Sequence, residues 1–213
     1  MGTFVPVYLH SDQAVALDVS PAMVQEARQR WGRYSHIRFL VGDITQPETL
    51  EVLQGLPFDT VLAVNVLEHI ADEQRALKHM FSLLRLQGHA VVYVPARPEL
   101  FGRLDVSLGH RRRYTRRVLV QRLQEVGFTI RVCRPVNTLG ILGWWWDNWL
   151  RRYEAIPLWQ VKLFDALVPL WRPMEERLRR VWPTMPGLSL LCVACKPAGK
   201  ETPERNPFRR ARL

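Results

Sequence analysis

A strand and the start of a helix are encoded together in the stretch Ala14-Val-Ala-Leu-Asp-Val-Ser-Pro-Ala-Met23. Its apolar first half predicts a short buried strand that ends at Asp18. Ser20 is a preferred N-cap residue and Pro21 suits the first helical position, so a helix is expected from Pro21 to about Trp31. A strand followed at once by a helix is the unit from which parallel α/β sheets are built.

The same alternation continues along the chain. The apolar runs and capping residues predict strands at 37–41, 58–64, 89–94, 128–133 and 188–195, and helices at 72–86, with Gly88 as its C-cap, and at 116–126, between Thr115 and Gly127. This order predicts a three-layer α/β domain with a mostly parallel sheet. Ligands of such sheets bind beyond the carboxyl ends of the strands, which is where Asp18, Asp43 and Asn65 fall.

The composition is that of a globular protein with an uneven charge. The chain has 213 residues, of which 47% are apolar and 23% charged, and its net charge is +10. Residues 1–96 carry a net charge of −3 and residues 97–213 one of +13. A basic excess suggests nucleic acid or an anionic membrane as partner. Because the arginines lack a recognisable nucleic-acid-binding motif, no nucleic acid is expected as partner. An anionic membrane surface remains the possible partner.

Three stretches carry a resemblance to a known family, namely Val15-Ala-Leu-Asp-Val-Ser-Pro-Ala-Met23, Phe39-Leu-Val-Gly-Asp-Ile44 and Phe58-Asp-Thr-Val-Leu-Ala-Val-Asn-Val-Leu-Glu-His-Ile70. In this order and spacing they resemble the class I S-adenosylmethionine-dependent methyltransferases, especially small-molecule enzymes related to those of ubiquinone biosynthesis. The resemblance covers residues 2–128 and the terminal strand to residue 196. It implies a Rossmann-like sheet with an antiparallel last strand, S-adenosylmethionine as cofactor, and methyl transfer.

The strand-end carboxylates suit this cofactor. A carboxylate such as Asp18 can accept hydrogen bonds from both hydroxyls of a ribose, and Asp43 can accept from an exocyclic amine. Taken singly, each is more often an ordinary loop carboxylate at a strand end. The resemblance implies that the ribose, the adenine and the methyl-sulfonium end are bound by Gly2, Asp18, Val19, Asp43, Ile44, Asn65 and Val66.

The chain departs from the family at its first motif, an apolar strand followed by a glycine-rich turn. It begins Met1-Gly2-Thr3-Phe4, which resembles only the final glycine of that turn. A sheet without this strand would have a gap between the strands that end at Asp18 and Asn65, with unpaired backbone groups on both sides. The hypothesis that follows is that the protein starts further upstream and that Met1 is an internal methionine. The alternative is a catalytically impaired fragment, or a module that binds a partner or a membrane.

The candidate acceptor site lies in residues 101–115, which read Phe-Gly-Arg-Leu-Asp-Val-Ser-Leu-Gly-His-Arg-Arg-Arg-Tyr-Thr. Histidine titrates near neutral pH, so His110 is a candidate base, with Tyr114 as a second candidate catalytic residue. The acceptor-binding candidates are Asp105, Arg112 and Arg113, since arginines bind phosphates and carboxylates. A solvated arginine loop is the equally weighted alternative, and no metal site is expected.

Residues 138–186 differ in kind, because they contain seven of the eight tryptophans. Pro157, Pro169 and Pro173 interrupt them, which predicts several short amphipathic helices. We expect a helical insertion that closes over an acceptor or lies on a membrane, although packing as core is an equal alternative. The methyltransferase core is then 1–137 and 187–197, and 198–213 is expected to be a disordered basic tail.

The expected acceptor is a small or lipid-linked molecule, and the expected compartment is the cytoplasm. No signal peptide or spanning segment is recognisable. A lipid-linked acceptor would place the protein at the inner face of the membrane. Cys192 and Cys195 match C-x-x-C, but they lie three apart in a predicted strand, so their sulfurs diverge and neither metal nor redox use is expected.

Overall fold

The computed structural model describes residues 9–53, 55–145, 158–182 and 185–198. The chain forms two compact units, which we call the N-terminal unit (Met1–Leu56) and the C-terminal unit (Pro57–Leu213). Each unit is described by itself. None of the helices among the described residues is both long and apolar enough to cross a bilayer.

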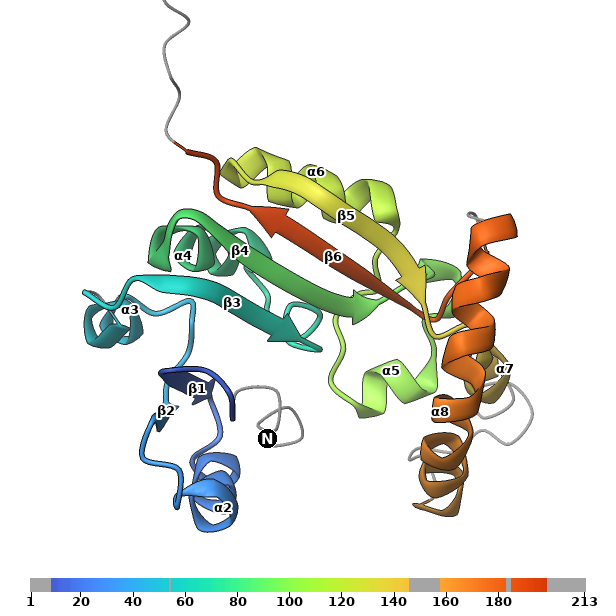
Figure 1. The fold of residues 1–213 in the computed structure, drawn as a ribbon, viewed down its shortest axis with the longest axis horizontal. Coiled ribbons are helices and arrows are strands. Elements are labelled where there is room, and N and C mark those ends of the chain that lie inside the picture. Colours follow the sequence, from blue (N-terminus) through green and yellow to red (C-terminus); the bar gives the residue numbers. More distant parts are fainter. Residues whose placement is uncertain (1–8, 54, 146–157, 183–184, 199–213) are drawn as a thin grey trace, which may run out of the picture. The chain divides into compact units, whose positions relative to one another are not determined.

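The N-terminal unit is a two-stranded parallel sheet with helices (Figure 1). Its elements are β1 (Ala14–Asp18), α2 (Pro21–Trp31), β2 (Ile37–Val41) and α3 (Pro47–Leu53). The predicted N-cap is confirmed, because the Ser20 hydroxyl accepts a hydrogen bond from the Met23 amide. A small core forms where α2 contributes Val24 and Ala27 against Ile37 and Phe39 of β2.

The C-terminal unit is built on a four-stranded sheet in the order β3-β4-β6-β5. Its elements are β3 (Phe58–Val64), α4 (Glu73–Leu83), β4 (Leu84–Pro95), the 3-10 helix η1 (Pro98–Leu100), α5 (Arg103–Ser107), α6 (Arg116–Val126), β5 (Thr129–Val136), α7 (Leu139–Trp145), α8 (Leu158–Val181) and β6 (Ser189–Cys195). β3 and β4 are parallel, and β6 is antiparallel to both β4 and β5. The predicted α/β class and the antiparallel last strand are confirmed.

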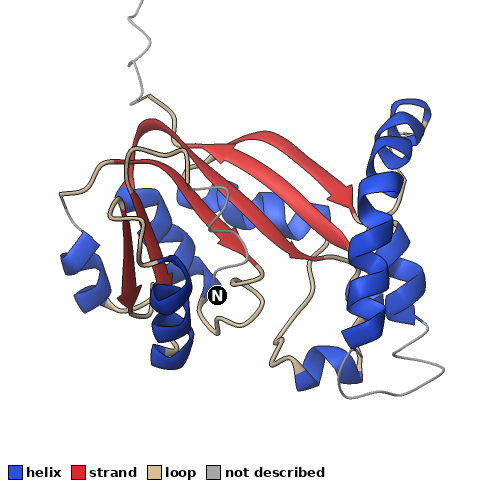
Figure 2. Cartoon of the chain, turned by 60° about the horizontal axis from the view of Figure 1, so that its bottom comes forward, coloured by secondary structure: helices blue, strands red, loops and turns tan. Residues whose placement is uncertain are grey.

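Two amphipathic helices cover one face of this sheet (Figure 2). The buried side chains of the two helices are Ala76, Leu77 and Met80 of α4 and Leu119 and Leu123 of α6. Buried residues of the central strands are Ala90 and Val92 of β4 and Cys192 of β6. Thr115 caps α6 by accepting from the Val118 amide, and Gly127 ends it at φ 111°. Both ends of α6 are as predicted.

The expected C-terminal end of one helix is wrong. α4 stops at Leu83 instead of Leu86, and Gly88 lies inside β4 instead of capping the helix. A Cβ at Gly88 would lie 2.9 Å from the Arg85 carbonyl oxygen and 3.1 Å from that of Asp59, so the glycine permits close backbone approach.

The tryptophan-rich segment does not break at its later prolines. Pro169 and Pro173 lie inside the 24-residue helix α8, where several short helices were expected. The two prolines are four residues apart, so they lie on one side of the helix, and both are exposed. Water can therefore satisfy the carbonyls that lose their intrahelical partners there.

Among the described residues, β1 and β3 are each an edge strand of the sheet in their own unit. β1 pairs only with β2, and β3 pairs only with β4, so the strands ending at Asp18 and next to Asn65 each leave one edge unpaired. Residues 198–213, expected to form a tail, lie outside the described residues except for Ala198.

Candidate methyltransferase site

Two loops of the C-terminal unit form the candidate acceptor site. They follow β3 and β4, whose carboxyl ends meet at one edge because the strands are parallel. The Arg111 amide donates to the Glu68 carbonyl (2.8 Å), and the Arg111 side chain donates to the His69 carbonyl (3.0 Å). Arg112 donates to the carbonyl of Ala71 (3.0 Å). The two loops are thus joined residue by residue.

Asp105 is the centre of this site. Its Oδ1 accepts hydrogen bonds from His110 Nδ1 and Arg113 Nε, each at 2.8 Å, and its Oδ2 accepts from the Gly102 amide at 3.0 Å. The carboxylate is fully buried. Burial alone would raise the pKa of Asp105, but the hydrogen bonds from His110 and Arg113 outweigh it and lower that pKa. An ionised Asp105 fixes the proton on Nδ1 and leaves His110 Nε2 as an acceptor.

Glu68 faces this acceptor and was not foreseen from the sequence. Its side chain is fully buried, and neither carboxylate oxygen has a hydrogen-bond partner among the residues that the structure describes. Oε1 lies 4.0 Å from His110 Nε2. Burial raises the pKa of Glu68 to about 7. A carboxyl group held near neutrality beside an imidazole is typical of proton-transfer sites.

His69 completes a cluster at the solvent side. Its ring meets the His110 ring edge to face at 4.9 Å, and its Nδ1 donates to the Gly109 carbonyl at 3.2 Å. Burial lowers the pKa of His69. One donor atom from each of Glu68, His69 and His110 lies within 4.8 Å of the others. One carboxylate and two imidazoles suit a divalent transition metal, and the unpartnered oxygens of Glu68 fit that role.

Tyr114 is withdrawn from solvent and occupied. Its ring is 1% exposed and its hydroxyl donates to Glu73. Burial and this carboxylate strongly raise the pKa of Tyr114. Glu73 also pairs with Arg112 at 3.0 Å and Arg122 at 3.3 Å. In this arrangement Tyr114 and Arg112 tie the loop to α4 and α6, so they support the site from behind.

Arg113 is likewise a support. It is 6% exposed and donates to the Ala96 carbonyl at 3.0 Å, besides holding Asp105. The Trp144 ring of α7 covers its guanidinium at 4.3 Å, and the Trp144 indole N–H donates to the Leu100 carbonyl at 3.3 Å. One tryptophan of the 138–186 segment therefore closes over the acceptor loop.

The expected ribose and adenine ligands meet in the N-terminal unit. Asp18 and Asp43 follow neighbouring parallel strand ends, and the Gly42 amide donates to the Asp18 carbonyl at 3.0 Å. One carboxylate oxygen of Asp18 accepts from the Ser20 amide at 2.9 Å, and one of Asp43 accepts from the amide and hydroxyl of Thr45 at 2.8 Å. These bonds aim both carboxylates at the strand-end edge. Val19 beside them is 67% exposed, and Ile44 follows Asp43 directly.

The remaining expected cofactor residues lie elsewhere. Asn65 ends β3 at φ 50°, a left-handed conformation that asparagine tolerates, and its amide donates to the Tyr93 carbonyl at 2.8 Å. Val66 is 39% exposed. Gly2 lies outside the described residues. The expected cofactor ligands are thus divided between the two units.

Comparison with known proteins relates part of this chain to a methyltransferase domain. Residues 2–90 match a family model described as a methyltransferase domain. A curated relative, an uncharacterised 37.1 kDa protein in a transposon of Streptomyces fradiae, is 26% identical over 151 residues, covering 65% of this chain and 43% of the relative. The chain spans less than half the length of that relative.

Solved structures share the fold. The N-methyltransferase NodS from Bradyrhizobium japonicum, solved with S-adenosyl-L-homocysteine, is 18% identical with a TM-score of 0.57 over 92% of this chain and 74% of NodS. A methyltransferase from Mesorhizobium loti is 16% identical with a TM-score of 0.56 over 86% and 80%. The [4+2]-cyclase SpnF is 18% identical with a TM-score of 0.57 over 92% and 70%. The chain therefore matches a methyltransferase domain over residues 2–90 and shares the fold of these solved methyltransferases.

Proposed function

We propose that the chain transfers the methyl group of S-adenosylmethionine to a small-molecule or lipid-linked acceptor, with His110 as general base. The observation that carries this proposal is the hydrogen bond from His110 Nδ1 to buried Asp105. It places the proton of a neutral His110 on Nδ1, so that Nε2 is the acceptor and lies 4.0 Å from Glu68 Oε1. A base held in one tautomer by a buried carboxylate is the arrangement that proton abstraction from an acceptor requires.

The chemistry follows from the charge of the cofactor. A lone pair of the acceptor forms the new bond to the methyl carbon while the carbon–sulfur bond breaks, and the sulfonium becomes a neutral thioether. The acceptor proton passes to His110 Nε2, and Asp105 stabilises the imidazolium that forms. Arg113 keeps Asp105 ionised and in place. The remaining contribution is alignment of donor and acceptor in a water-poor site.

The unpartnered oxygens of Glu68 favour a second candidate, in which Glu68, His69 and His110 hold a divalent cation. Such an ion would act as a Lewis acid on an acceptor oxygen. Under this candidate His110 binds through Nε2, and Asp105 orients its ring as the outer partner that metal-bound histidines usually have.

The test is methyl transfer from radiolabelled S-adenosylmethionine into a membrane and small-molecule extract, together with calorimetric titration of S-adenosylhomocysteine. The rate of methyl transfer by the His110→Gln variant should fall at least about 100-fold, because general-base catalysis contributes roughly 10²–10⁴-fold. Its affinity for S-adenosylhomocysteine should be unchanged. The matched control is His89→Gln, an exposed histidine in the middle of β4. Equal transfer by His110→Gln and wild type would remove His110 as base. Absence of product binding by the wild-type chain would instead favour the non-catalytic module.

His69 separates the two candidates. If the cluster binds a metal, His69→Gln removes one of its three ligands, so methyl transfer should fall. Chelation should also abolish transfer by the wild type, and added Mn²⁺ or Zn²⁺ should restore it in the wild type but not in His69→Gln. A pure base mechanism predicts that chelation and His69→Gln each leave transfer within about threefold. Metal content measured by mass spectrometry after loading and desalting gives the same answer without an acceptor.

A further inference from the structure

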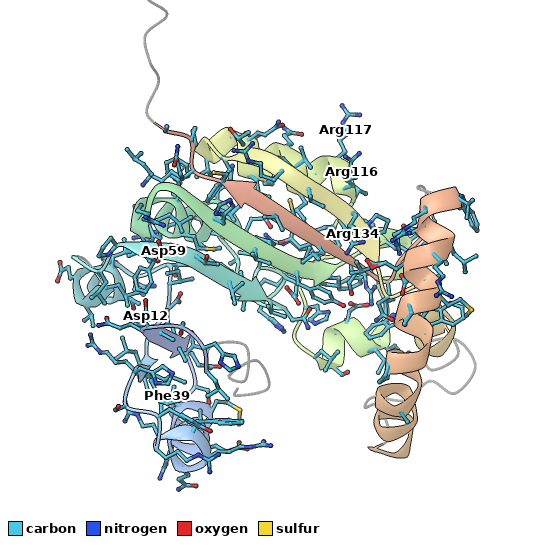
Figure 3. All side chains as sticks on the ribbon, in the orientation of Figure 1. Asp12, Phe39, Asp59, Arg116, Arg117 and Arg134 are labelled. Carbon is cyan, nitrogen blue, oxygen red and sulfur yellow. The ribbon has the colours of Figure 1, made fainter. Side chains whose placement is uncertain are left out.

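α8 turns its polar side toward the fold. Glu175 accepts hydrogen bonds from the amide and hydroxyl of Thr138, at 3.2 and 3.0 Å. Glu176 pairs with Arg134 at 2.9 Å, where Arg134 projects from β5 beside α8 (Figure 3). Arg179 pairs with Glu175 and reaches back to the Thr138 hydroxyl. The contacts that attach this helix are therefore ionic and polar.

The opposite side of the same helix segment is apolar and exposed. Met174 and Leu178 are 43% and 40% exposed, and Val181 and Trp182 are 82% and 56% exposed. The Trp182 amide donates to the Leu178 carbonyl, so Trp182 continues the helical path. Spacings of three and four residues place all four side chains on one face. A surface helix of a globular protein normally shows the reverse orientation.

Arg177 borders this stripe, while Arg180 lies on the side of the helix that faces Arg134 and Glu176. Arg177 and Arg180 are exposed and have no ion-pair partner among the described residues. They belong to the part of the sequence, residues 97–213, that carries a net charge of +13. An apolar helix face that includes tryptophan and is edged by arginine suits the boundary between lipid headgroups and acyl chains.

We propose that the outer face of α8, formed by Met174, Leu178, Val181 and Trp182 and bordered by Arg177, binds the surface of an anionic membrane. The proposal deepens the proposed function, on which it rests only for the acceptor: it names a lipid surface as the place where a lipid-linked acceptor is met. The positive charge makes a zwitterionic surface a poorer partner, because electrostatic attraction adds to burial of the apolar stripe.

Vesicle co-sedimentation tests the proposal with the full chain. Wild type should bind vesicles of phosphatidylcholine with 30% phosphatidylglycerol at least about 10-fold more tightly than pure phosphatidylcholine vesicles, with binding weakened at high salt. The double variant L178D/V181D should lose this binding, and R177E should weaken the preference for phosphatidylglycerol. The control is V118D on α6, where Val118 is 42% exposed against 40% for Leu178. Wild type without lipid preference, or L178D/V181D binding like wild type, overturns the proposal.

Two further measurements separate this outcome from others. Light scattering should show that the wild type is a monomer. If the wild type is instead a dimer that does not bind vesicles, and L178D/V181D is a monomer, the face binds a second copy of the chain and the membrane proposal is overturned. Circular dichroism melting should show L178D/V181D folded, since the changed side chains are exposed. Titration with S-adenosylhomocysteine reports on the proposed function separately: loss of that binding leaves the vesicle result intact, and the converse also holds.

Discussion

Carboxylates are held by different means in the two units of the chain. In the N-terminal unit, Asp18 and Asp43 accept hydrogen bonds from groups two residues further along, Ser20 and Thr45. In the C-terminal unit, Asp105 is held across eight residues by Arg113. Asp18 and Asp43 lie in local turns beside a two-stranded sheet, while Asp105 is buried beside a four-stranded sheet.

This difference shows which of the carboxylates depend on tertiary structure for their position. A turn that closes over two residues forms with its own strand end, and two strands alone supply little stability. A buried carboxylate survives only when the surrounding loops and helices bring its partners together. Asp18 and Asp43 should therefore tolerate substitution without loss of fold, whereas loss of the charge partner of Asp105 should destabilise the fold.

Arg113→Met should have the largest effect, because it leaves Asp105 buried without its charge partner. We expect a loss of about 3–5 kcal/mol in the free energy of unfolding of the C-terminal unit, measured by urea denaturation. Arg117→Met, at an exposed arginine of α6 (Figure 3), is the control and should cost less than about 0.5 kcal/mol. A loss below about 1 kcal/mol for Arg113→Met would mean that Asp105 does not depend on this partner.

Glu68→Gln should reveal the cost of burying a carboxyl group. Because the pKa of Glu68 rises from 4.5 to about 7 on folding, the wild type loses stability as the pH rises from 4.5 through 7. The amide has no charge to bury, so the variant should gain about 3 kcal/mol over the wild type at pH 8 and nothing below pH 4.5. Urea midpoints across this pH range measure it. A pH-independent difference would contradict the raised pKa.

Asp18→Ala should act on binding and leave the fold alone. Removal of a charged acceptor from the ribose hydroxyls is expected to cost about 1.5–3 kcal/mol, or roughly 10–100-fold in S-adenosylhomocysteine affinity by calorimetry. Asp12→Ala, an exposed residue of the same unit (Figure 3), provides the comparison and should bind like the wild type. Equal affinity for both variants would show that Asp18 does not contact the cofactor.

Ser20→Ala should give the smallest and most local effect. Loss of the N-cap of α2 is expected to cost about 1 kcal/mol. Hydrogen exchange should then quicken in β1 and β2 and stay unchanged in β4 and β6. Uniform quickening in all four strands would show instead that the two units unfold together.

The local elements of both units were predictable from the sequence. The N-caps Ser20 and Thr115 and the stop at Gly127 occur as predicted, because each depends on neighbours within a few residues. The end of α4 was not predictable, since Leu84 enters β4 by pairing with Phe58. The continuity of α8 through Pro169 depends likewise on which side of the helix meets solvent.

By itself the sequence determined the α/β class, the strand-end placement of Asp18, Asp43 and Asn65, and His110 as a candidate base, because strand ends, caps and residue chemistry are local properties. Only the tertiary structure decided that Glu68 faces His110 and that Asp105 and Arg113 lie behind it, instead of facing an acceptor. It likewise decided that Tyr114 is joined to Glu73, 41 residues away. Burial is the physical reason: which polar groups share a site shielded from water depends on loops from different strands meeting, and no spacing in the sequence records that.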